Sequence, residues 1–218
     1  MEKSIESIWK KGFMDPQALI APKLNKLYTK KSIHIIDKFK RMFRLNLILI
    51  VIGSMVILGM SFIVGLPYMG VPMFFAMNAL VLVNKKLLNS LERVNKGENS
   101  YDYLTAFDEW IKYQISINKK FSRFFYPFVF LSLVAGFWMK QSGELTLGQQ
   151  IVDKLLLSYP DLQLIYGVPV IGVCCVASVV VLLYVLGGKI YEWDLKIVYG
   201  RILKKLDEIL KDIKELKE

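Results

Sequence analysis

Few residues in this chain have side chains that could carry out catalysis or bind a metal ion. His34 is the only histidine, so neither a histidine-based metal cluster nor a Ser-His-Asp triad can be assembled. Cys174 and Cys175 are adjacent, which does not fit a CxxC redox or zinc site, and we interpret them as small packing residues. The acidic pair Asp108 and Glu109 has no histidine or cysteine beside it, which is typical of a solvated helix face. We therefore predict a protein that is not an enzyme, with no catalytic residues, no cofactor and no metal site.

Motifs that bind phosphate groups or nucleic acid are also missing. The sequence contains no GxxxxGK[ST] loop and no GxGxxG turn between a strand and a helix. The net charge is +10, from 29 Lys+Arg against 19 Asp+Glu, but the basic residues flank long apolar segments, where anionic lipid headgroups account for them. No helix-turn-helix or aromatic-glycine signature accompanies this charge. We predict that the chain does not bind nucleic acid.

The apolar residues are concentrated in long uncharged windows. The chain of 218 residues is 54% hydrophobic, and its charged residues all fall outside Leu45–Asn84, Phe124–Met139 and Leu162–Gly188. A helix needs roughly 20 residues to cross about 30 Å of hydrocarbon, so the first window is long enough for two spans, separated at Gly65 and Pro67. The sequence thus predicts an all-α polytopic membrane protein with four transmembrane helices and amphipathic cytoplasmic helical extensions. We place the spans at about 45–64, 67–84, 121–139 and 168–187, with Pro169 starting the last and Gly187 and Gly188 closing it.

Basic residues predict how the chain is threaded. Of the 29 Lys and Arg residues, 27 lie in the segments 1–44, 85–123 and 189–218, and two lie in 140–161. Because cytoplasmic segments carry an excess of Lys and Arg, we expect both termini and residues 85–120 on the cytoplasmic side. The external loop 140–167 then connects the spans of the pair at 121–188, as Gly65 connects those of the hairpin at 45–84. The expected location is the bacterial inner membrane.

The region 1–44 is predicted to contain an amphipathic helix that runs straight into the first span. The basic residues nearest the expected membrane surface are Lys38, Lys40, Arg41 and Arg44. One interpretation is an interfacial helix whose basic face contacts anionic lipid headgroups. In the alternative, the apolar face packs on the other cytoplasmic helices and the basic side chains are solvated.

The other cytoplasmic segments also have helical periodicity. Residues 85–120 fit a helical hairpin that extends the second and third spans. Residues 189–218 carry apolar side chains in a heptad register over about three repeats. Packing within the chain, self-association and binding of a foreign partner are all consistent with this stripe.

Two groups of apolar residues are candidates for docking a partner protein. Near the N-terminus, one side of a short predicted helix carries Ile5, Ile8 and Trp9, which also fits a membrane-surface anchor. On the C-terminal helix, the candidate edge carries Leu206, Ile209 and Ile213.

The spans themselves contain few polar side chains. Asn78 is the strongly polar residue near a span centre, and we expect it to form an interhelical hydrogen bond; in the alternative it lines a polar path with Ser132. Apart from Arg123 at the mouth of the third span, no charged residue lies in the spans, although proton- and ion-coupled transporters generally need one at membrane depth. In the external loop, the sequence predicts a short helix at about 147–157 capped by Thr146.

These features favour a non-enzymatic membrane regulator or adaptor whose cytoplasmic helices bind a protein partner. Its plan, cytoplasmic helices tethered by membrane spans, is similar to that of membrane-bound anti-sigma factors, but the His-x3-Cys-x2-Cys motif of the zinc-containing members is missing and no residues match. A structural or assembly subunit of an inner-membrane complex is the alternative. A channel or carrier for a neutral or lipidic substrate is the third hypothesis.

Overall fold

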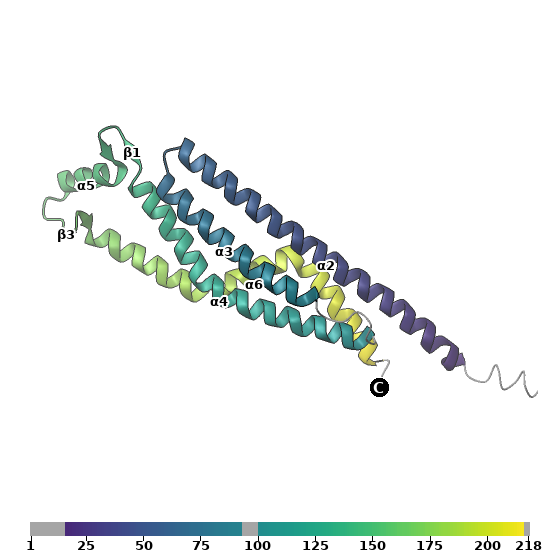
Figure 1. Cartoon of the computed structure of the whole chain (residues 1–218). Coiled ribbons are helices and arrows are strands. Elements are labelled where there is room, and N and C mark those ends of the chain that lie inside the picture. Colours follow the sequence, from purple (N-terminus) through teal and green to yellow (C-terminus); the bar gives the residue numbers. More distant parts are fainter. Residues whose placement is uncertain (1–15, 93–99, 216–218) are drawn as a thin grey trace, which may run out of the picture.

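The computed structural model describes residues 16–92 and 100–215, with side chains described in 33–91 and 103–212. Four long helices run along one another (Figure 1): α2 (Pro16–Ile63), α3 (Pro67–Glu92), α4 (Ser100–Trp138) and α6 (Val170–Glu215). We call the end that holds the α2–α3 turn and residues 139–169 the loop end. We call the opposite end, where α2 and α4 begin and α3 and α6 finish, the terminal end. The described part of the chain is all-helical apart from two short strand pairs.

Each long helix is apolar enough and long enough to cross a membrane. The expected run of the N-terminal helix into the first span is confirmed, because α2 is one unbroken helix of 48 residues. The turn that follows also agrees with the sequence. Gly65 adopts a positive φ of 75°, and the amide of Leu66 donates to the carbonyl of Ser61 at 2.6 Å, which closes α2 before Pro67 begins α3.

The fourth span departs from expectation at both of its ends. Pro169 belongs to strand β4 (Val168–Pro169), which pairs with β3 (Leu164–Ile165), so α6 begins at Val170. Gly187 and Gly188 do not close the helix, which continues to Glu215. Gly187 serves a close helix crossing instead: a Cβ built there would lie 2.9 Å from Arg123 Cα and 2.9 Å from the Ser122 carbonyl oxygen of α4.

The loop end contains the short helix that the sequence predicts. Strands β1 (Gln141–Ser142) and β2 (Leu145–Thr146) form an antiparallel pair that leads into α5 (Leu147–Ser158). Thr146 is its N-cap and forms a capping box with Gln149: the Gln149 amide donates to Thr146 Oγ1 at 3.3 Å, and the Thr146 amide donates to Gln149 Oε1 at 2.9 Å.

The main hydrophobic core lies towards the terminal end. Most of its residues fall outside the uncharged windows of the sequence. Aromatic side chains of three helices meet there. The ring centroid of Phe39 on α2 lies 5.5 Å from that of Phe107 and 6.1 Å from that of Trp110, both on α4. It lies 5.2 Å from the ring centroid of Tyr199 on α6. Helix α3 adds its buried leucines Leu87, Leu88 and Leu91. Towards the loop end, by contrast, large apolar side chains of α2, α3, α4 and α6 are exposed, as expected for helices whose solvent is lipid.

Candidate functional site

Between the apolar spans and the terminal-end core lies a buried group of amide side chains, which we call the polar junction. It consists of the amides of Asn84 on α3 and of Gln114 and Asn118 on α4, together with the hydroxyl of the half-buried Tyr191 on α6, so it joins three helices. The three amides are almost fully inaccessible. Each lies on the helix face that continues the core, so their burial must be offset by hydrogen bonds.

The polar junction supplies those hydrogen bonds internally. Asn84 and Asn118 form a reciprocal pair: Asn84 Nδ2 donates to Asn118 Oδ1 and Asn118 Nδ2 donates to Asn84 Oδ1, both at 3.0 Å. The Asn84 oxygen also accepts from Gln114 Nε2 at 3.3 Å, and Gln114 donates to the Tyr191 hydroxyl at 3.4 Å. Such a network fixes how the three helices align along their axes, because a shift of one turn would leave buried amides unpaired.

A cavity of about 190 Å³ adjoins the polar junction. Besides the junction residues, its polar lining includes Asn46 of α2, Ser122 and Tyr126 of α4, and Asp194 of α6. The cavity has room and polar partners for several water molecules. Its chemistry is that of a hydrated helix junction. In the described part of the chain, no group of three or more His, Cys, Asp or Glu side chains could hold a metal ion.

The structure places the predicted docking residues differently from one another. Leu206 and Ile209 are buried in the terminal-end core, because the heptad stripe of α6 packs against the other helices, and an intact bundle does not offer these side chains to a partner. The backbone of Ile213 is helical, but its side chain lies outside the described residues. Ile5, Ile8 and Trp9 also lie outside them.

A different part of α6 presents large apolar side chains to the surroundings. Trp193 and Ile197 are spaced by four residues, so they share one helix face, and they are 69% and 83% exposed. They lie beyond the uncharged window that ends at Gly188. The heptad stripe predicted only the apolar face of α6 that is buried in the core. The sequence signal for the exposed apolar face was the Trp-x3-Ile spacing among charged residues.

Three of the four predicted membrane-surface basic residues are exposed. Lys38, Arg41 and Arg44 lie on the outside of α2, and Lys38 and Arg41 line a shallow surface groove with His34. Lys40 is a correction: only 7% of it is exposed, because its backbone position falls on the side of α2 that carries the core residues Ile36 and Phe43.

The intramembrane polar residues each have a partner. Asn78 Nδ2 donates to Ser54 Oγ of α2 at 3.1 Å and to the Phe74 carbonyl at 2.8 Å, which is the interhelical hydrogen bond expected of it. Ser132 donates to the Phe128 carbonyl of its own helix at 2.8 Å. Cys174 and Cys175 are exposed on α6, so they are not the packing residues that we expected.

Charged side chains near the junction pair with each other. Asp108 forms an ion pair with Lys112 at 2.6 Å, one turn away on α4, which agrees with a solvated helix face. Lys119 of α4 forms an ion pair with Glu192 of α6. Sequence reasoning missed the polar junction itself. Its signal was the amides Gln114 and Asn118, which continue the helix face of Phe107 and Ile111 at intervals of three and four residues.

The chain matches no known protein-family model, no curated protein and no solved structure.

Proposed function

We propose that this protein is an integral membrane regulator or adaptor without enzymatic activity, whose cytoplasmic helices bind a protein partner. The sequence segments 1–44, 85–123 and 189–218 carry 27 of the 29 basic residues, and the described parts of these segments lie towards the terminal end, which supports placing that end in the cytoplasm. The amphipathic cytoplasmic extensions are then the terminal-end parts of α2, α3, α4 and α6.

The observation that carries this proposal is the position of the core. In the described residues, the main cluster of buried apolar side chains lies where the helices extend beyond the apolar spans. With the terminal end in the cytoplasm, this body lies outside the bilayer, where a soluble partner can reach it. A helical body of this kind gives a partner a rigid surface on which to dock.

The docking surface that we propose comprises Trp193 and Ile197 of α6 together with the N-terminal segment of Ile5, Ile8 and Trp9. Exposed aromatic and aliphatic side chains in contact with water are unfavourable unless something covers them, and such residues dominate binding energy at protein interfaces. Polar residues surround the pair on α6, among them Lys196 and Asp194. This arrangement of an apolar centre with a charged rim is typical of a reversible protein interface.

The test is site-specific photocrosslinking in native membranes. A photoreactive amino acid at Ile197 should capture one soluble protein, and deletion of residues 1–20 should lower that yield. The control is the same amino acid at Asp207, an exposed polar position on the same helix, which should capture little. Equal capture at the two positions, or capture of lipid alone at Ile197, would refute the docking surface.

The alternative is a structural or assembly subunit of an inner-membrane complex. It is favoured by the exposure of α6, whose most apolar stretch is almost entirely unburied by the rest of the chain. Stoichiometric membrane proteins crosslinked to Ile171 or Val185, in place of a soluble protein at Ile197, would establish this second function.

A further inference from the structure

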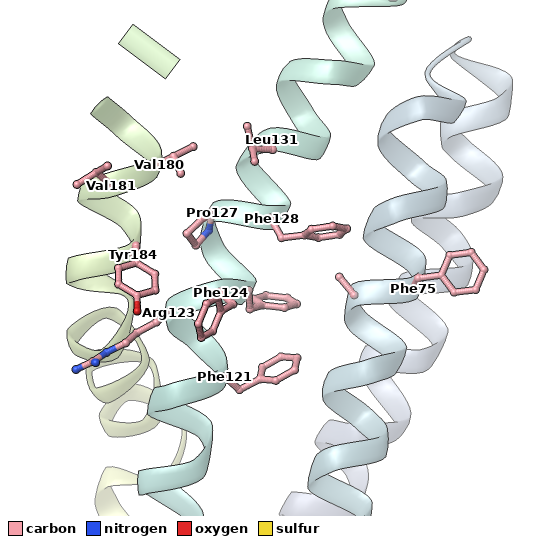
Figure 2. Close-up of a pocket in the computed structure, with 12 residues that line it drawn as sticks. Phe75, Phe121, Arg123, Phe124, Pro127, Phe128, Leu131, Val180, Val181 and Tyr184 are labelled. Atoms are coloured by element: carbon pink, nitrogen blue, oxygen red, sulfur yellow. The ribbon is translucent and has the colours of Figure 1, made fainter. Parts of the chain in front are cut away.

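An apolar groove lies between α4 and α6, in the part of the bundle that carries the uncharged windows. Helices α4 and α6 touch where Gly187 meets Ser122 and Arg123, and from this crossing towards the loop end they border an apolar groove of about 700 Å³. Figure 2 shows side chains that line this groove, among them Phe124, Phe128 and Leu131 of α4, and Val181 and Tyr184 of α6. Ala76 of α3 lines the same space.

The groove is lined along most of its length by apolar side chains, which suit the acyl chain of a lipid. Its lining is almost entirely aliphatic and aromatic, and the rings of Phe124 and Tyr184 meet edge to face with centroids 5.3 Å apart. Its side chains are widely exposed, so the protein leaves the space for its surroundings to fill. At membrane depth those surroundings are acyl chains, and an apolar chain of that kind fits a groove of this volume.

One cation lies at the end of the groove nearer the terminal end. Arg123 begins beside Phe124, and its Nε lies 3.8 Å from the position that a Cβ on Gly188 would take, so the side chain extends across α6. In Figure 2 the Tyr184 hydroxyl points towards this arginine. Among the residues whose side chains are described, none forms an ion pair or hydrogen bond with the guanidinium. An unpaired guanidinium and a phenol together offer several donors to one phosphate group.

We propose that this groove is a binding site for one anionic phospholipid of the leaflet on the terminal-end side. An acyl chain lies along Phe124, Phe128 and Leu131, and the phosphate contacts Arg123 and Tyr184. The depth is appropriate, because Arg123 stands at the boundary between the uncharged window of α4 and its charged part. The assignment rests on the membrane placement of the helices and is independent of any protein partner.

The site differs from the basic surface of α2 in its geometry. Lys38 and Arg41 lie on the outside of one helix and can attract a negatively charged membrane in a general way. The groove joins a headgroup position to a chain position across two helices. It holds the chain at one end, and at the other end the Arg123 cation favours a headgroup whose phosphate charge is not offset by a choline cation.

The experiment places the full-length protein in phosphatidylcholine nanodiscs that contain a small fraction of a photoactivatable phospholipid. The probe carries a diazirine on one acyl chain and either a phosphatidylglycerol or a phosphatidylcholine headgroup, and labelled peptides are mapped by mass spectrometry. We expect labelling at 124–131 and 180–184, about five- to tenfold higher for phosphatidylglycerol. Arg123→Gln should reduce the phosphatidylglycerol yield to that of phosphatidylcholine. Lys120→Gln, which removes a charge one turn away on α4, should preserve the preference.

A second pair of variants tests the chain-binding part. Val181 and Val185 of α6 are exposed to the same degree, 62% and 64%, but only Val181 lines the groove. Val181→Trp should abolish labelling by both probes, and Val185→Trp should leave it unchanged. Equal labelling by the two headgroups, or an equal loss in Lys120→Gln and Arg123→Gln, would overturn the proposal. Crosslinks between two copies at this face, with little lipid labelling, would also overturn it, because the groove would then be an interface between copies.

Discussion

Replacing Gly187 with alanine tests the close crossing of α4 and α6. A Cβ at this position would lie 2.9 Å from Arg123 Cα, 2.9 Å from the Ser122 carbonyl oxygen and 3.2 Å from Arg123 N. All three atoms belong to the backbone of α4, so no side-chain rotation can relieve the overlap, and the helices must move apart. Overpacking of this kind costs about 1–3 kcal/mol.

Gly188→Ala is the matched control because it is adjacent on the same helix. The nearest atom to its added Cβ is Arg123 Nε at 3.8 Å, an ordinary contact. Both substitutions replace glycine in a helix interior by a better helix former, which favours the folded state by about 1 kcal/mol in each. This gain cancels when the two variants are compared. Gly187→Ala should therefore be about 1–3 kcal/mol less stable than Gly188→Ala, which corresponds to at least fivefold in the unfolding equilibrium constant.

The assay is reversible unfolding of the purified protein by SDS in mixed micelles, followed by circular dichroism. Equal unfolding free energies for the two variants would refute the close crossing. In that outcome, both unfolding free energies would differ from that of the unsubstituted protein by the same amount, and helix propensity, not contact with α4, would account for the difference.

Two other predictions use the polar junction and the α5 cap. Asn118→Ala should lower the unfolding free energy by about 2 kcal/mol in the same assay, because Asn84 loses its reciprocal partner while it stays buried. The double variant Asn84→Leu with Asn118→Leu should lose less than the sum of the two single leucine variants, and strict additivity would contradict the network. Thr146→Ala should speed amide hydrogen exchange in α5 about fivefold, since an N-cap contributes about 1 kcal/mol, whereas Ser142→Ala should not, because only the Ser142 carbonyl is used there.

The elements that the sequence predicts well are those governed by local rules. The four apolar helices follow from the length of the uncharged windows, and the turn at Gly65 follows from a residue that tolerates a positive φ. The α5 helix begins where Thr146 and Gln149 allow a capping box. Each of these signals lies within a few residues of the feature that it specifies.

The features that the sequence did not predict depend on contacts between distant segments. Gly187 is a residue type that often ends helices. Its place inside a continuous helix is explained only by the backbone of α4, which packs too close for a side chain. Lys40 is a residue type usually found at the surface. It is buried because it lies on the side of α2 that faces the core. In the sequence, Gln114 and Asn118 interrupt an apolar helix face, and their burial is explained only by Asn84 of another helix, which forms hydrogen bonds with both.

The aromatic cluster of the terminal end also constrains how the protein can be made. Phe39 and Tyr199 meet in this cluster, although 160 residues separate them along the chain. Helix α2 must therefore wait for α6, and the core cannot close until the segment that carries Tyr199 has been synthesised and packs against Phe39. A chain in which α6 is missing or misplaced leaves the rings of Phe39, Phe107 and Trp110 uncovered, and chaperones and proteases recognise apolar surfaces of this kind. The cluster thereby makes the folding of α2 depend on the presence of α6, so neither helix can complete the core alone.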